Sequence, residues 1–136
     1  MNVIDIAMLA FVMWKEASGE GEAGMEAVGN VVWNRAKKYK TSIYVQCVAP
    51  NQFSSITVRG DQGTVRWPHE TDPVWVQAQQ ISQNFANIGQ ISDPTKGALY
   101  YENPKIATSG WFFNNIVNKP DQHPKLVTLG NHVFYA

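Results

Sequence analysis

Three stretches of the chain repeat apolar residues at the spacing of an α-helix. The first covers residues 3–17 and follows Asn2, a residue type that caps helix N-termini. The second covers about 24–39. The third covers 73–88 and opens with a capping aspartate followed by proline at the first helical position. We therefore predict three main helices, the first of them buried on nearly every side.

Each of the two later helices has an apolar face. On the second helix it consists of Met25, Val28, Val32 and Ala36. On the third it consists of Val74, Trp75, Ala78, Ile81, Phe85 and Ile88, and Gly89 ends that helix. Gly29 in the middle of the second helix costs helix stability, and such a glycine often allows a neighbouring helix to approach closely.

The remaining segments lack a helical pattern. Residues 41–69 form a long connection, a type of segment that is often functional in a compact domain. Residues 93–97 predict a turn, and the short aromatic segments 98–102 and 132–135 predict an antiparallel pair. The predicted fold is mainly α (α+β), a single domain over residues 1–136 with long loops and a small β element.

Composition narrows the class of protein. Hydrophobic residues make up 44% of the 136 residues and charged residues 16%, which excludes a disordered chain. The net charge is zero, so no overall field favours nucleic acid or an anionic membrane. The single cysteine, Cys47, excludes an internal disulfide and is expected to be a small buried residue. We expect a monomer without a cofactor or a bound metal.

The apolar stretch at residues 3–14 predicts a core helix and not a membrane segment. It contains Asp5 and is about half the roughly 20 residues that a membrane-spanning helix needs. It also lacks the basic start and the small-residue cleavage site of a signal peptide. We expect no membrane insertion and no export signal.

Glu16 and Glu20 are the strongest candidates for chemistry. Glu16 lies near the C-terminal end of the first helix, where a buried carboxyl group is costly to keep ionised. A protonated glutamic acid at the lip of a helix suits a general acid near neutral pH. Glu20, four residues later, is either a second carboxylate for glycoside cleavage or a structural residue that holds backbone amides. Glu16 as a plain solvated helix-end residue stays open as well.

Other motifs give less support to a function. The glycines of segment 19–24 fit a dinucleotide-binding pattern, but they follow a helix, whereas that pattern must follow a strand. The three histidines, His69, His123 and His132, lack the spacing of a zinc helix, although a metal-dependent amidase or peptidase would use them. Tyr100 and Tyr101 mix with amide side chains as in a sugar-binding groove. Alternation along a strand sends them to opposite faces, so at most one of them faces a ligand.

These pieces resemble, in order, the SleB-like cell wall hydrolases. The segment Glu16-Ala17-Ser18-Gly19-Glu20 is similar to the opening motif of that family. The later marks follow in order: Gly24, Ala27-Val28, Asn34-Arg35, Gln52-Phe53-Ser54, Asp93-Pro94-Thr95, Gly97-Ala98, Tyr100-Tyr101, Trp111 and the closing segment 130–135. The chain departs at Lys15, where the family usually has glycine, and at Ser18, where it often has arginine. The resemblance covers about residues 8–135.

The resemblance implies a lysozyme-like, lytic-transglycosylase-like domain that cuts the glycan strands of peptidoglycan. It makes Glu16 the catalytic acid and gives Glu20 a less certain supporting role. Gln52, Ser54, Tyr100, Tyr101 and His132 are further candidates for support or substrate binding. The expected bond is the β-1,4 link between N-acetylmuramic acid and N-acetylglucosamine, with 1,6-anhydromuramic acid as the product. A hydrolytic muramidase and a non-catalytic peptidoglycan-binding module are the alternatives.

The chain resembles a bare catalytic domain. We therefore expect a phage endolysin that stays in the host cytoplasm until it is released to the periplasm and the cell wall. Its expected partner is the glycan strand, and nucleic acid is not expected to bind.

Overall fold

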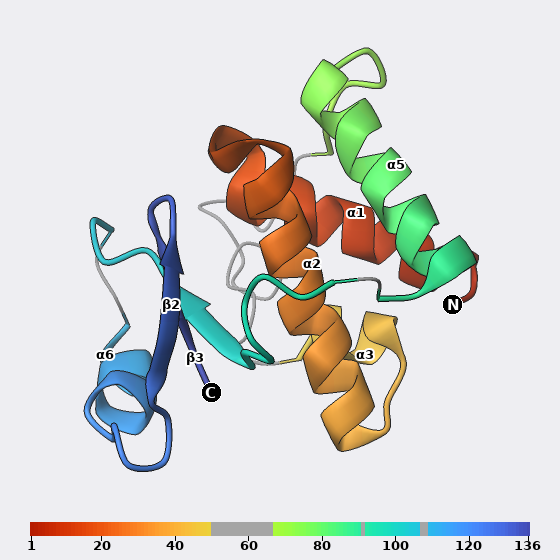
Figure 1. Cartoon of the computed structure of the whole chain (residues 1–136). Helices are drawn as coiled ribbons and strands as arrows, with labels where there is room; N and C mark the ends of the chain where they lie inside the picture. The colour runs from red at the N-terminus through yellow and green to blue at the C-terminus, as the bar shows by residue number, and fades with distance from the viewer. Residues whose placement is uncertain (50–66, 91, 107–108) are drawn as a thin grey trace.

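The computed structural model describes residues 1–49, 67–90, 92–106 and 109–136. Four helices lie together in one part of the molecule, and a small sheet with its own short helix lies beside them (Figure 1). Helix α2 runs between the sheet and the other long helices. The helices are α1 (Val3–Ala17), α2 (Gly21–Tyr39), α3 (Ile43–Cys47), α5 (Pro73–Ile88) and α6 (Gly110–Phe112), with a 3-10 turn η1 (Ser18–Glu20) and a π-helical turn η2 (Phe113–Val117).

Helix α1 begins and ends as its sequence predicts. The Asn2 side chain accepts a hydrogen bond from the Asp5 backbone N–H (2.8 Å), and the Asp5 carboxylate accepts one from the Asn2 N–H (3.0 Å). This capping box satisfies backbone donors at the helix start. The prediction of burial on nearly every side holds only for the middle of the helix, because Val3 is 81% exposed and Ile4 58%.

Helix α2 has the predicted apolar face but begins earlier than predicted, at Gly21 and not at Gly24. Gly21 has φ +72°, a conformation that glycine adopts at little cost, so the chain reverses there directly into the helix. Gly29 allows the close approach that its position suggested. A Cβ at Gly29 would lie 2.8 Å from Met13 Sδ and 2.9 Å from Phe85 Cε2, so α1, α2 and α5 meet at this point.

Helix α5 is confirmed at both ends. The Asp72 carboxylate accepts from the Val74 N–H (2.9 Å), and Gly89 ends the helix with φ +79°. The same carboxylate accepts from the Trp14 indole N–H (3.0 Å), which fixes α5 to α1. Ile88 was predicted on the apolar face of this helix, but it lies at the helix end and is 63% exposed, so it is not part of the core.

The sheet has three antiparallel strands in the order β1 (Tyr100–Glu102), β3 (His132–Tyr135) and β2 (Lys125–Leu129). The predicted pair is β1 and β3, with Tyr101 opposite Phe134. Phe134 is fully buried against Ala27 and Val31, so this face of the sheet packs on α2. Val133 and Tyr135 point to the other face, where they pack with Ile116 of η2.

Four elements were not predicted. Helix α3 lies inside segment 41–69, which lacks a helical pattern, and Ser42 caps this helix by accepting from the Val45 N–H (3.2 Å). Strand β2 and the helical turns α6 and η2 are also additions to the predicted fold. Cys47 is fully buried in the helical core, as predicted.

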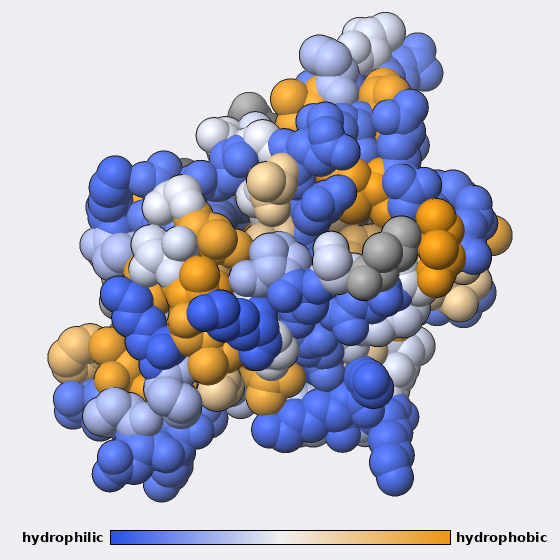
Figure 2. Space-filling view, in the orientation of Figure 1, coloured by the Kyte–Doolittle hydropathy of each residue, from blue (hydrophilic) through white to orange (hydrophobic). Residues whose placement is uncertain are grey.

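On the face drawn in Figure 2 the surface is mostly hydrophilic, with apolar residues reaching it over the sheet and beside α5. The exposed aromatic residues include Trp111 and Phe113, on α6 and η2. Within the described residues, no helix is both long and apolar enough to cross a bilayer.

Candidate active site

Glu16 lies in the last turn of α1, at the edge of the helical core. Its side chain is half-buried, between buried Ala17 and half-buried Lys15. The helix ends at Ala17, and the chain passes through η1 and Gly21 into α2. Glu16 and Glu20 therefore do not lie on one continuous helix, and the shared helical face considered from their spacing does not form.

Tyr101 of β1 meets Glu16 directly. Its hydroxyl is hydrogen-bonded to the Glu16 carboxyl group. Burial raises the pKa of Tyr101 well above its ordinary value, and the Glu16 carboxylate raises it further. The phenol therefore keeps its proton at neutral pH and acts as a hydrogen-bond donor to Glu16.

His132 at the start of β3 completes this group. The residue is 5% exposed, and its ring packs edge-on against Tyr101 with ring centroids 5.2 Å apart. Burial lowers the pKa of His132, although the nearby carboxylates of Glu20 and Glu16 act in the opposite direction. The imidazole is therefore neutral at pH 7 and able to donate one hydrogen bond and accept another.

Glu20 is engaged with the backbone of the turn between β2 and β3. Its Oε2 accepts a hydrogen bond from the Asn131 N–H over 3.3 Å. Of the two roles considered from the sequence, this contact favours the one in which Glu20 holds backbone amides. The turn brings Glu20 close enough to affect the charge state of His132, the residue that follows Asn131.

The other predicted site residues divide into two groups. Tyr100 lies against Arg35, whose guanidinium carbon is 5.2 Å from the ring centroid, and against His123 at 5.1 Å. Tyr100 and Tyr101 thus have different surroundings, and only Tyr101 is brought to Glu16. Gln52 and Ser54 lie outside the described residues.

The histidines do not come together. His69 is exposed beside Thr71, with its Nδ1 2.7 Å from the Thr71 hydroxyl. The Nδ1 of His123 lies 2.8 Å from the backbone carbonyl oxygen of Ala136. Across the described ranges, no three His, Cys, Asp or Glu side chains are grouped so that they could hold a metal ion.

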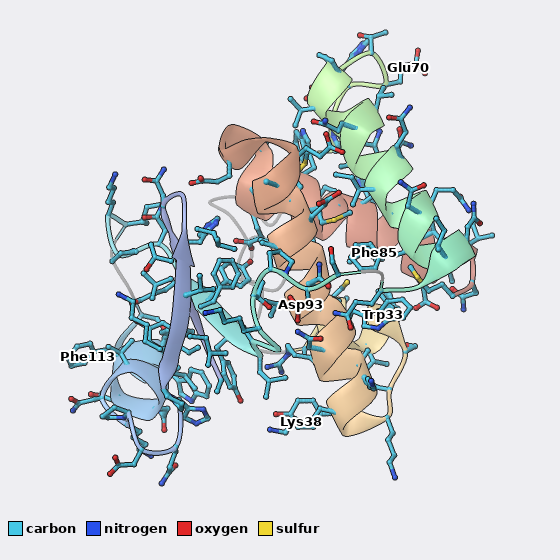
Figure 3. All side chains as sticks on the ribbon, viewed as in Figure 1. Trp33, Lys38, Glu70, Phe85, Asp93 and Phe113 are labelled. Atoms are coloured by element: carbon cyan, nitrogen blue, oxygen red, sulfur yellow. The ribbon has the colours of Figure 1, made fainter. Side chains whose placement is uncertain are left out.

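Two polar networks tie α2 to neighbouring segments. The Asp93 carboxylate accepts hydrogen bonds from Asn34 Nδ2 (2.8 Å), the Thr95 N–H and hydroxyl (2.8 and 2.6 Å) and the Gly97 N–H (2.9 Å), which ties the turn before β1 to α2 (Figure 3). Arg35, 6% exposed, donates to Gln46 Oε1 (3.0 Å) and to the Leu99 carbonyl (3.2 Å). Residues 93–97 were predicted as a turn from the sequence, but the buried partners of Asn34, Arg35 and Asp93 were not.

A pocket of a different kind lies between α2 and α5. Its lining includes Glu26, Asn30, Asn84 and Phe85. Phe85 of α5 lies against Gly29 on this side of α2, whereas Ala27 and Val31 pack with Phe134 of the sheet. Figure 3 labels Phe85. Among the described residues that line it, Glu26 alone is titratable, so these residues offer no pair of groups for acid–base chemistry.

Comparison with known proteins shows the family of this chain. The model of one protein family, described as cell wall hydrolase, matches residues 19–135. The chain belongs to the cell wall hydrolase family. The resemblance inferred from the sequence motifs is thereby confirmed.

Curated relatives of this cell wall hydrolase are spore cortex-lytic enzymes. The enzyme from Halalkalibacterium halodurans is 30% identical over 132 residues, which cover 96% of this chain and 34% of that protein. The one from Bacillus subtilis is 29% identical over 132 residues, with 96% and 37% covered. The chain thus spans little more than a third of the length of these relatives.

Solved structures confirm the predicted fold class. The catalytic domain of the germination-specific lytic transglycosylase SleB from Bacillus anthracis has a TM-score of 0.71 and 27% identity, and the match covers 100% of this chain and 97% of that one. The catalytic domain of the Bacillus cereus SleB protein gives 0.69 and 27%, with 99% and 91% covered. The cell wall hydrolase described here has the fold of a lytic-transglycosylase catalytic domain, mainly helical with a small sheet.

Proposed function

We propose that this chain cleaves the β-1,4 bond between N-acetylmuramic acid and N-acetylglucosamine in peptidoglycan, as a lytic transglycosylase. The observation that carries the proposal is the Glu16 carboxyl group, half-buried and held by the Tyr101 hydroxyl beside His132. The likeness to the SleB catalytic domains supports the same reaction class.

In the proposed reaction, protonated Glu16 donates its proton to the glycosidic oxygen as the bond to the muramyl anomeric carbon breaks. The transition state has oxocarbenium character. Glu16, now a carboxylate, takes the proton from the muramyl 6-hydroxyl, whose oxygen bonds to the anomeric carbon and closes the 1,6-anhydro ring. The proton on Glu16 is thus restored, and no water is consumed.

This route needs one carboxyl group that acts first as acid and then as base. The engagement of Glu20 with the Asn131 N–H is consistent with that requirement. Hydrolysis by water at the same site would give an ordinary reducing end. Both outcomes use Glu16, and they differ in whether the cleft excludes water at the second step.

The decisive experiment compares wild-type protein with Glu16→Gln on purified peptidoglycan and weighs the released fragments. Anhydro products are about 18 mass units lighter than hydrolysed ones, since no water is added when the glycosidic bond breaks. Loss of the general acid should lower the rate by roughly two to four orders of magnitude. Glu22→Gln is the matched control, because Glu22 is exposed in the first turn of α2 and hydrogen-bonded to Gln77 (3.2 Å).

The alternatives have their own outcomes in the same experiment. Hydrated products that disappear in Glu16→Gln identify a muramidase with the same acid. Binding to peptidoglycan without soluble fragments identifies a non-catalytic module. Release of peptides that stops in a chelator identifies a metal-dependent amidase, and activity of Glu16→Gln equal to wild type contradicts the mechanism.

The endolysin setting is part of the proposal and has a separate test. Cytoplasmic expression should leave cells intact until their inner membrane is permeabilised, and lysis should then follow. Lysis of intact cells on expression alone contradicts a protein that waits in the host cytoplasm.

A further inference from the structure

Glu20 is enclosed by two glycines that come from opposite ends of the chain. A Cβ on Gly24 of α2 would collide with the Cβ of Glu20, and a Cβ on Gly130 would collide with its Oε2. Gly130 has φ +57° at the first position of the two-residue turn between β2 and β3, where glycine is favoured. The Glu20 carboxylate therefore fits against a turn that leaves no room for a side chain.

A continuous series of contacts leads from this turn to the proposed catalytic acid. Glu20 accepts from the Asn131 N–H (3.3 Å), and Asn131 is followed directly by His132. The His132 ring packs edge-on on the Tyr101 ring at 5.2 Å. The Tyr101 hydroxyl is hydrogen-bonded to Glu16. Movement of the turn away from α2 would shift His132 and change the packing that orients Tyr101.

We propose that Glu20 is a positioning residue: it fastens the β2–β3 turn to the helical part of the molecule and so holds His132 and Tyr101 in place against Glu16. It is then not the second carboxylate of a two-carboxylate glycosidase. This inference rests on the proposed function for its catalytic readout, but the fastening itself is a property of the fold.

The chemistry of Glu20 agrees with this assignment. A general base that activates water needs a free acceptor directed at the substrate. The Oε2 of Glu20 accepts from a backbone amide and lies against Gly130, so this oxygen contacts the turn and not a substrate. Glutamine at this position keeps an amide oxygen that accepts the same hydrogen bond, whereas alanine does not.

The first test therefore compares Glu20→Gln and Glu20→Ala with Glu16→Gln. We expect Glu20→Gln to stay within about tenfold of wild-type kcat/KM. Glu20→Ala should lose about 100-fold, mostly in kcat, because displaced catalytic groups cost rate even when substrate still binds. Glu22 is an exposed acid on α2, so Glu22→Gln should have the kcat/KM of wild type. A folded Glu20→Gln that is as inactive as Glu16→Gln overturns the proposal.

A spectroscopic measurement tests whether Glu20 lies close to His132. The Glu20 carboxylate raises the pKa of His132 against the effect of burial. In Glu20→Ala the NMR titration midpoint of the His132 ring should therefore fall further. An unchanged His132 midpoint contradicts the contact between the turn and Glu20.

The second test needs no activity. Gly130→Ala introduces a Cβ against Glu20 Oε2, and we expect it to destabilise the wild-type fold more than it destabilises Glu20→Ala, where the carboxylate is gone. The strain of a positive φ is common to both backgrounds and cancels in the comparison. If the two costs are equal, Glu20 does not hold the turn, even when the enzyme is active. If they differ but no fragments are released, the fastening stands and the proposed function fails.

Discussion

The hydroxyl of Tyr101 is hydrogen-bonded to the carboxyl group of Glu16, across the boundary between the small sheet and the helices. Glu16 lies in the last turn of α1, near the start of the chain, and Tyr101 lies in β1. The contact joins the two parts of the fold at the proposed reacting group. A hydrogen-bond donor at this place fixes the direction of the Glu16 carboxyl group.

Tyr101→Phe should therefore reduce kcat/KM by about 10- to 100-fold, the usual value of a hydrogen bond to a charged group. The ring packing against His132 is retained, so thermal unfolding should change little. Kinetics on soluble glycan fragments measure the loss. Tyr39→Phe is the control, because Tyr39 is 44% exposed at the end of α2. A Tyr101→Phe protein with wild-type kinetics would show that Glu16 needs no such donor.

The long helices could be predicted because their signals are local. Asn2 and Asp72 cap helices that begin directly after them, and apolar residues recur at helical spacing behind each cap. Helix α3 is only five residues long, so it holds too few positions to show a period. Strand β2 depends on pairing with β3, and nothing local in residues 125–129 requires it.

The site was predictable only in part, for a similar reason. The sequence motifs pointed to Glu16, Tyr101 and His132, but their mutual contacts join segments far apart in the chain. Alternation along β1 correctly indicated that Tyr100 and Tyr101 would face different surroundings. The Asp93 and Arg35 networks were missed because single polar residues in a sequence do not reveal their buried partners.

Asp93 should make the fold sensitive to acid. Burial alone would raise the pKa of Asp93, but the hydrogen bonds from Thr95, Asn34 and Gly97 outweigh it and hold the pKa below its usual 3.8. A carboxyl group whose pKa is lower in the folded state stabilises the fold fully above its ordinary pKa. That contribution disappears as the pH falls through the folded value.

Asp93→Asn should therefore lower the free energy of unfolding at pH 7 by up to about 1 kcal/mol, since Asp93 is only half-buried and solvent screens its charge, and should weaken the dependence of that free energy on pH below about 4. Urea unfolding at several pH values measures both effects. Asp121→Asn is the control, since Asp121 is exposed. An equal acid dependence in Asp93→Asn and wild type would contradict the assignment to this carboxylate.

Arg35 should not be replaceable by lysine. Its guanidinium donates to Gln46 and to the Leu99 carbonyl and lies over the rings of Tyr39 and Tyr100, at 5.3 and 5.2 Å. Lysine keeps the charge but lacks the planar fork that reaches both acceptors. Arg35→Lys should cost about 1–3 kcal/mol of stability by leaving a buried acceptor unpaired. Lys37 is exposed on the same helix, so Lys37→Arg should leave the unfolding midpoint unchanged. An Arg35→Lys variant as stable as wild type would contradict the need for a guanidinium group at position 35.

Gly29 should be the glycine that the helical core needs most. Alanine is a better helix former, so Gly29→Ala gains up to about 1 kcal/mol in helix propensity. Its methyl group would, however, lie within 3 Å of both Met13 Sδ and Phe85 Cε2, and crowding a packed core costs about 1–3 kcal/mol. The Phe85 ring is 7% exposed and packs on Trp33, with ring centroids 5.6 Å apart, so it has little room to move. We expect a net loss of stability on thermal unfolding.

Gly19→Ala is the control. A Cβ at Gly19 meets nothing within 4 Å, so this variant should be neutral or slightly stabilising. If both variants raise the melting temperature, the close contact of α1, α2 and α5 does not require glycine at position 29.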